Sequence, residues 1–169
     1  MNKNIIIYID AANIILSARD ANFDLDPDLL FQHLYDKYRD CKIIFFIGDV
    51  KYLDTIRDII LKHKIELIIK QTVKEGGKIK ANCDVELANR LTVDVERNSV
   101  ESIILLSGDG DFVALTDYAR KMKKEVRCIS FAPENTSIFI KQREYLKVMY
   151  LIQIRDLVEN KKALIKHAT

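Results

Sequence analysis

The stretch Ile5-Ile-Ile-Tyr-Ile-Asp10-Ala-Ala-Asn13 begins with five apolar residues and ends on an aspartate followed closely by an asparagine. A nearly continuous run of β-branched and aromatic residues is typical of a strand that is buried on both faces of a parallel sheet. Ligands of such sheets bind beyond the carboxyl ends of the strands, so Asp10 stands where a functional site is expected.

Similar apolar runs recur along the chain, and residues with helical period lie between them. We expect strands at residues 5–9, 42–47, 65–70, 102–106, 125–131 and 146–151. Apolar residues repeat at three and four between Leu29 and Tyr38, behind a helix start at Asp26-Pro27, and again between Leu53 and Leu61. Strand and helix in alternation indicate βαβ crossovers, so we predict a three-layer α/β fold with a mainly parallel central sheet.

The chain has 169 residues, of which 49% are hydrophobic, and this is sufficient for one domain with a proper core. Neither a linker nor an internal repeat interrupts it. We therefore expect a single domain over residues 1–169, with a core at about 3–151 and a closing helix at about 153–166. Basic and acidic residues number 27 and 25 and are mixed along the chain, which excludes a disordered charged tail.

The sequence shows neither a recognisable targeting segment nor a cysteine-based metal-binding motif. No apolar run approaches the ~18–20 residues that cross a bilayer, and the first run is too short for a signal peptide. The three cysteines, Cys41, Cys83 and Cys128, form no CxxC pair, and the histidines are equally scattered. This pattern excludes a zinc motif and leads us to expect a cytoplasmic protein without membrane association.

Two aspartates, Asp109 and Asp111, directly follow the expected strand at 102–106. A single acid at a strand end is often only a helix cap, which is our interpretation of Asp49. Two carboxylates separated by one residue repel each other unless a cation lies between them. The glycines at 108 and 110 are expected to permit backbone conformations that other residues resist. The pair therefore indicates a metal site.

Asp84 gives an independent indication of a metal. In a helix expected over residues 82–98, at ~100° per residue, Asp84 lies within about 40° of the apolar stripe that faces the sheet. A carboxylate there costs several kcal/mol unless it is paired, protonated or bound to metal. Capping of the helix by Asn82 or Asp84 is the alternative. Arg90 points away from the stripe and is expected to be only solvated.

These acids from separate segments can converge on one cleft. The candidate metal ligands are Asp10, Asp84, Asp109 and Asp111. A set of oxygen ligands without His or Cys favours Mg²⁺ or Mn²⁺, which can neutralise a phosphate and activate water in a phosphodiesterase. Asn13 can donate its amide to the substrate phosphate, and Ser107 can cap the turn, orient an aspartate or contact the substrate.

Residues 70–80 carry four lysines around a Gly-Gly pair, and we expect a flexible cationic loop. Lysines near a phosphodiester chain add affinity that is independent of sequence and sensitive to salt, which makes Lys74, Lys78 and Lys80 candidate substrate-binding residues. An ordinary solvated loop is the alternative. The formal net charge of the chain is +2, so the rest of the molecule carries +6 if the four aspartates are set aside as metal ligands. A surface with this positive charge would favour the binding of nucleic acid.

Other charged and aromatic residues are expected to be structural. A second basic cluster that includes Lys121 and Lys123 is interpreted as solvated. The aromatic residues Tyr118, Phe131 and Phe139 are expected in the core rather than as stacking platforms. Residues 138–151 are apolar enough to pack internally or across a homodimer, so both arrangements stay open.

Three motifs, in this order, resemble those of the NYN domain in the PIN-like nuclease superfamily. They are residues 5–13, Lys80-Ala-Asn-Cys-Asp84-Val-Glu-Leu-Ala and Leu105-Leu-Ser107-Gly-Asp109-Gly-Asp111-Phe112. The resemblance runs from about residue 3 to about residue 151. It implies a Rossmann-like sheet and a Mg²⁺- or Mn²⁺-dependent ribonuclease that acts in RNA processing or decay on single-stranded or structured RNA.

The family pattern also implies roles for individual residues. Asp10, Asp84, Asp109 and Asp111 would form the acidic metal site with Asn13 beside it, and Lys80 matches a lysine that often precedes the helix acid. Two positions depart from the pattern. Many relatives carry another acid after the helix aspartate, where this chain has Arg90 and then Asp94, and many carry a proline after the position of Asp111.

Two other functions remain open from the sequence. Asp109-Gly-Asp111-Phe-Val113 matches the DxDx[TV] motif of haloacid-dehalogenase-like phosphatases, in which the first aspartate attacks phosphorus, although that motif usually follows the first strand. An NYN-like module that binds RNA or protein without cutting is the second alternative. The sequence contains no P-loop and no GxGxxG motif.

Overall fold

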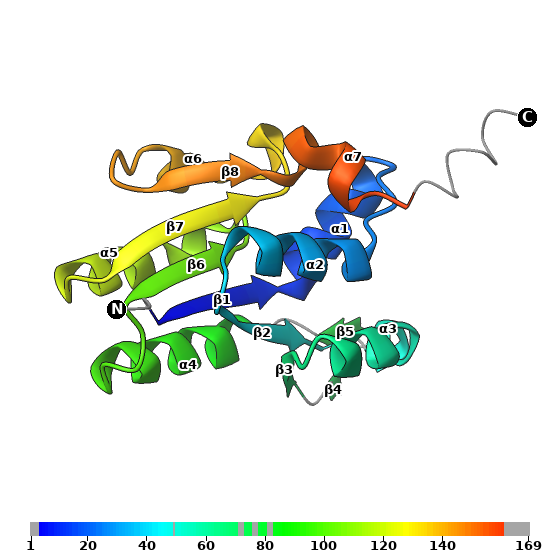
Figure 1. Cartoon of the computed structure of the whole chain (residues 1–169), viewed down its shortest axis with the longest axis horizontal. Helices are drawn as coiled ribbons and strands as arrows, with labels where there is room; N and C mark the ends of the chain where they lie inside the picture. The colour runs from blue at the N-terminus through cyan, green and yellow to red at the C-terminus, as the bar shows by residue number, and fades with distance from the viewer. Residues whose placement is uncertain (1–3, 49, 71–72, 76–77, 81–82, 161–169) are drawn as a thin grey trace, which may run out of the picture.

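The computed structural model describes residues 4–160 except 49, 71–72, 76–77 and 81–82. Within these residues, a central sheet of six parallel strands has the order β3-β2-β1-β6-β7-β8 (Figure 1). Its strands are β1 (Ile5–Asp10), β2 (Lys42–Ile47), β3 (Glu66–Ile69), β6 (Ser102–Leu106), β7 (Glu125–Ser130) and β8 (Lys147–Tyr150). The predicted parallel sheet is confirmed, and each predicted strand lies within two residues of its observed ends.

Helices cover both faces of this sheet, which confirms the predicted three-layer α/β fold. They are α1 (Ala11–Asp20), α2 (Pro27–Lys37), α3 (Val50–Lys62), α4 (Asp84–Glu96), α5 (Val113–Lys121), α6 (Ile138–Lys141) and α7 (Arg155–Val158). One core cluster lies between the sheet and α1, α2, α3 and α7, and a second lies between the sheet and α4, α5 and α6. No helix among the described residues has both the length and the apolar character that a membrane span requires.

The apolar runs form strands because both of their faces are buried. In β1, Ile7 and Ile9 pack into the first core cluster, and Ile6 and Tyr8 pack into the second. Alternate side chains of a strand point to opposite faces of the sheet. A strand that is buried on both faces therefore has apolar residues at every position and does not alternate between apolar and polar residues. The same division holds in β6, where Ile104 and Leu106 face one cluster and Ile103 and Leu105 the other.

The start of α2 agrees with its prediction, whereas the closing helix does not. Asp26 accepts hydrogen bonds from the backbone N–H groups of Asp28 (2.9 Å) and Leu29 (3.3 Å), and a proline occupies the first turn. The predicted helix at 153–166 is wrong in extent, because α7 ends at Val158. Glu159 then forms an antiparallel bridge with Leu25, which draws the backbone out of the helix. Residues 161–166 lie outside the described part of the chain.

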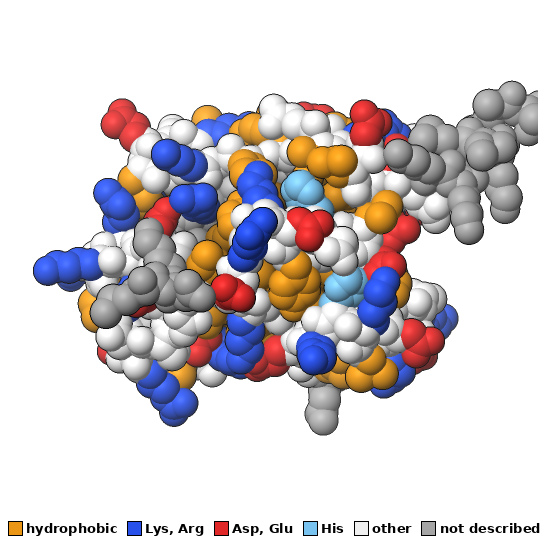
Figure 2. Space-filling view, viewed as in Figure 1, with side chains coloured by type: hydrophobic (Ala, Val, Ile, Leu, Met, Phe, Trp, Pro, Cys, Tyr) orange, Lys and Arg blue, Asp and Glu red, His pale blue; other side chains and the backbone are white. Residues whose placement is uncertain are grey.

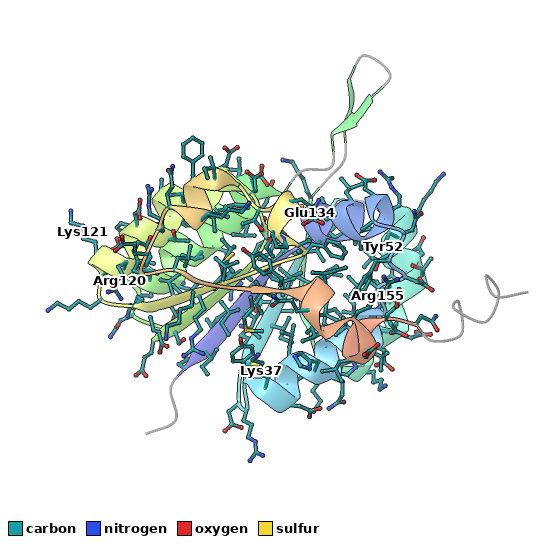
Figure 3. All side chains as sticks on the ribbon, turned by 90° about the horizontal axis from the view of Figure 1, so that it is seen from above. Lys37, Tyr52, Arg120, Lys121, Glu134 and Arg155 are labelled. Carbon is teal, nitrogen blue, oxygen red and sulfur yellow. The ribbon has the colours of Figure 1, made fainter. Side chains whose placement is uncertain are left out.

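The segment expected as a loop at 70–80 contains a short antiparallel hairpin. Its strands are β4 (Val73–Glu75) and β5 (Lys78–Lys80), and it projects away from the body of the molecule (Figure 3). A Gly-Gly pair between two short runs is itself a hairpin signal, so the sequence carried this information. The side chains of Lys74, Lys78 and Lys80 lie outside what the structure describes.

Candidate metal centre

The strand order of the sheet reverses between β1 and β6, and residues from the ends of these two strands meet there. Asp10 ends β1, and Ser107 directly follows β6. The Ser107 Oγ donates a 3.0 Å hydrogen bond to Asp10 Oδ2, which joins segments 97 residues apart. Such a reversal leaves a crevice at the carboxyl edge of a parallel sheet, where ligands of these folds bind.

Asp10 is a buried carboxylate with fixed hydrogen bonds. It is 5% exposed, and its Oδ1 accepts from the backbone N–H of Asn13 at 3.2 Å as the cap of α1. Burial raises its pKa to about 6, although the bonds from Asn13 and Ser107 lower it, and the negative charges of Asp84 and Asp109 raise it further. A cation near this carboxylate would therefore stabilise its charged form.

Three further aspartates lie together at this edge. Asp84, Asp109 and Asp111 each offer a carboxylate oxygen, and the three oxygens lie within 4.8 Å of one another. Two oxygens on opposite sides of one Mg²⁺ ion are about 4.2 Å apart, so the cluster is near the size that one ion needs. Asp84 is the first residue of α4, and Cys83 occupies the N-cap position, where its side chain does not cap the helix. Asn82 and Asp49 lie outside the described residues.

The loop that carries Asp109 and Asp111 is held by its own hydrogen bonds. Asp109 Oδ1 accepts from the backbone N–H of Asp111 at 3.0 Å, and the backbone N–H of Asp109 donates to Ser107 Oγ at 3.2 Å. The backbone N–H of Gly108 donates to Asn13 Oδ1 at 2.9 Å. The Oδ1 of Asn13 is thus occupied, and its Nδ2 group is the part of the side chain that can donate to a ligand.

Ser107 has no exposed surface, which limits what it can do. Its hydroxyl group bonds Asp10 and the backbone of Asp109, and its carbonyl oxygen lies 3.2 Å from the Cys128 Sγ. A fully buried hydroxyl in these contacts orients the aspartates. We therefore assign Ser107 to orientation in place of the substrate contact that the sequence allowed.

The glycines of this loop serve close packing. Neither Gly108 nor Gly110 has a backbone φ in the left-handed region, so the expectation of unusual backbone conformations is wrong. A Cβ at Gly108 would lie 2.2 Å from the carbonyl oxygen of Asn135, and one at Gly110 would lie 2.4 Å from Ser137 Oγ. The glycines allow the segment after β7 to pack directly on the aspartate loop.

A buried polar network behind α4 was missed from the sequence. The Tyr8 hydroxyl donates to Asp94 Oδ2 at 2.9 Å, and Arg90 Nε donates to the same oxygen at 2.9 Å. Arg90 also pairs with Glu66 of β3 and thereby lowers the pKa of that carboxyl group. The expectation that Arg90 is only solvated is therefore wrong. The signal was Tyr8, because a tyrosine in a fully buried strand needs a partner for its hydroxyl.

A cavity of about 200 Å³ lies beside α1, and Tyr52 at its wall is labelled in Figure 3. It is lined by Ala12, Ile15, Leu16, Arg19, Ile47, Gly48 and Tyr52. Ala12 is the chain neighbour of Asn13, but none of the four aspartates lines the cavity. The acidic cluster is thus separate from the lining of this cavity.

Comparisons with known proteins agree with this fold. A crystal structure of a protein of unknown function from Vibrio parahaemolyticus has the same fold, with a TM-score of 0.71 and 21% identity over 88% of this chain and 93% of that one. No curated protein matches the sequence. The family model of the NYN domain matches residues 4–148. This range contains β1, β2, β3, β6 and β7 of the central sheet and the first half of β8. The chain therefore belongs to the NYN domain family of the PIN-like nuclease superfamily.

Proposed function

We propose that this protein is a metal-dependent ribonuclease that hydrolyses phosphodiester bonds of RNA at Asp10, Asp84, Asp109 and Asp111. The observation that carries the proposal is the approach of three carboxylate oxygens to within 4.8 Å of one another, beside the buried Asp10. Membership of a nuclease superfamily supports the same conclusion.

The donor set fits a divalent ion that prefers oxygen. Asp84, Asp109 and Asp111 would hold Mg²⁺ or Mn²⁺, with Asp10 beside them, because carboxylates brought this close need a compensating cation. When bound, such an ion neutralises charge on the phosphate and makes a water molecule more acidic.

The remaining residues position the acids and the substrate. The hydroxyl of Ser107 and the backbone N–H of Asn13 fix the two oxygens of Asp10. The Asn13 Nδ2 group donates to a phosphate oxygen, since its Oδ1 is occupied by Gly108. Lys74, Lys78 and Lys80 on the projecting hairpin attract the RNA backbone without regard to sequence.

Cleavage of a labelled single-stranded RNA tests this proposal. We expect cleavage with Mg²⁺ or Mn²⁺ and none with EDTA. Asp109→Asn should lower the cleavage rate at least about 100-fold, because it removes one of the negative charges that balance the cation. The matched control is Asp54→Asn on α3, whose exposed carboxylate pairs with Arg57 and which should keep full activity.

Two results would replace this proposal with another function. Tight RNA binding without cleavage under every metal condition would assign a binding module. Hydrolysis of a phosphomonoester, with an aspartyl-phosphate trapped at Asp109, would assign a phosphatase, although Asp109 follows β6 and not the first strand of the sheet.

A further inference from the structure

Phe139 on α6 is exposed, which corrects the expectation that it belongs to the core. Its exposed fraction is 58%, whereas the next residue, Ile140, is 1% exposed. The helix has only four residues, so a single side chain of it reaches the core and the others remain outside. The other two aromatic residues agree with the prediction, since Phe131 is fully buried and Tyr118 packs against the second core cluster.

The ring of Phe139 lies directly against the aspartate loop. Its Cδ2 atom is 3.2 Å from the position that a Cβ of Gly110 would occupy, and Gly110 lies between Asp109 and Asp111. Hydrogen bonds hold the ring's segment in place. The backbone N–H of Ser137 donates to the Gly108 carbonyl oxygen at 2.9 Å, and that of Phe139 donates to Ser137 Oγ at 3.3 Å.

We propose that Phe139 is a stacking platform for a nucleobase of single-stranded RNA, next to the phosphate that the aspartate loop engages. This inference rests on the proposed function and names the form of RNA and the residue that holds it. A flat apolar ring suits this position because every base has a face that can stack, and stacking does not depend on charge. The acidic cluster beside it gives no attraction of its own to a polyanion.

A protein partner suits this surface less well. The exposed large apolar residues on α6 are Ile138 and Phe139, each 58% exposed. These two side chains on a four-residue helix make a small apolar patch, whereas a stable protein interface has a larger apolar core. One nucleobase, in contrast, needs no more than one ring.

Binding of RNA that contains 2-aminopurine tests the stacking in the Asp109→Asn protein with Mg²⁺, where cleavage is suppressed. We expect Phe139→Ala to raise the Kd roughly 5- to 100-fold and to abolish the fluorescence quenching of the bound base. Phe139→Trp should restore both. Ile138→Ala is the matched control, since this neighbour is equally exposed, and it should bind within about twofold of the parent.

A second variant distinguishes loss of stacking from misfolding of the protein. Phe139→Leu keeps an apolar contact with Gly110 but has no flat face, so it should behave as Phe139→Ala while its thermal unfolding stays close to that of the parent. Equal RNA binding by Phe139→Ala and Ile138→Ala would overturn the proposal. Self-association that Phe139→Ala abolishes, with RNA binding unchanged, would overturn it too and assign a protein contact.

Failure of the stacking proposal is distinguishable from failure of the proposed function. The function fails when the unmodified protein shows no metal-dependent cleavage of RNA. The stacking proposal fails alone when cleavage is present and Phe139→Ala leaves the KM for RNA unchanged. Absence of RNA binding by the unmodified protein would overturn the stacking proposal together with the proposed function, whereas loss of binding in Asp109→Asn alone leaves the KM of Phe139→Ala to decide the stacking proposal.

Discussion

Asp10 is an acid whose surroundings disfavour its charged form. Its carboxylate is 5% exposed and lies near the charges of Asp84 and Asp109, and burial is the main reason that its pKa rises to about 6. In an unfolded chain the same group titrates near 3.8. The folded protein therefore binds this proton more tightly, and Asp10 contributes stability below about pH 4 that is lost as the pH rises through about 6.

Replacement of Asp10 by asparagine should therefore stabilise the metal-free protein at neutral pH. The rise of this pKa from 3.8 to about 6 corresponds to at most about 3 kcal/mol. We expect Asp10→Asn to gain about 1–3 kcal/mol at pH 7.5 in EDTA and nothing at pH 4. Urea unfolding at both pH values measures this difference. Asp54→Asn is the control and should change the free energy of unfolding by less than about 0.5 kcal/mol at either pH. A less stable Asp10→Asn protein at pH 7.5 would contradict the burial of an uncompensated charge.

The sequence indicated candidate site residues where a residue's chemistry conflicts with its expected place. Asp84 on an inner helix face and the adjacent Asp109 and Asp111 needed an explanation, and the structure brings all three together. The prediction was wrong for Gly108 and Gly110, because their role depends on a segment almost thirty residues away that no local pattern reveals.

At the scale of elements, helix α4 is important because its first turn carries Asp84 and its third turn is bonded to β1. Asp94 on that third turn accepts from the Tyr8 hydroxyl of β1 and from Arg90, and is 8% exposed. These contacts fix α4 against β1, and so they also fix the position of Asp84 relative to Asp10.

Asp94→Ala should destabilise the fold by about 2–4 kcal/mol, because it leaves the buried Tyr8 hydroxyl without an acceptor and removes a partner of Arg90. Tyr8→Phe should destabilise the fold by only about 1–2 kcal/mol, because Asp94 then still accepts a hydrogen bond from Arg90. Denaturant unfolding of both single variants and the double variant measures the coupling. We expect the double variant to be less destabilised than the sum of the two, and strict additivity would show that the two groups do not interact.

The strands were predictable because burial on both faces leaves an unmistakable apolar run, as at β1 and β2. Helix ends were less predictable, because tertiary pairing decides them. The backbone of Glu159 pairs with Leu25 and ends α7, and nothing near Glu159 in the sequence indicates this. The β4–β5 hairpin had a local signal in its Gly-Gly pair, which the interpretation as a loop overlooked.

At the scale of the whole molecule, charge is mixed over much of the surface. On the face shown in Figure 2, Lys and Arg side chains are interspersed with Asp and Glu. The hairpin differs, because Lys74, Lys78 and Lys80 are concentrated in its two short strands. We therefore expect the hairpin to supply most of the salt-sensitive affinity for RNA.

Double replacement of Lys74 and Lys78 by glutamine should weaken RNA binding and reduce its salt dependence. Each lost phosphate contact lowers the slope of log K against log salt by roughly 0.7 for a single strand, so the pair should lower it by roughly 1.4. Titrations between low and moderate salt measure the slope. The control replaces Lys121 and Lys123 at the end of α5, and Figure 3 shows Lys121 far from the hairpin. Equal slopes for the two double variants would remove the hairpin from the RNA-binding surface.

Anomalous diffraction from a crystal of the protein soaked in millimolar Mn²⁺ examines the metal site itself. We predict at least one anomalous peak within coordination distance of carboxylate oxygens from Asp84 and from Asp109 or Asp111, close to Asp10. The same soak of Asp109→Asn crystals should show a weaker peak or none. An empty site at millimolar Mn²⁺ in the unmodified protein would contradict the metal centre and, with it, the proposed nuclease.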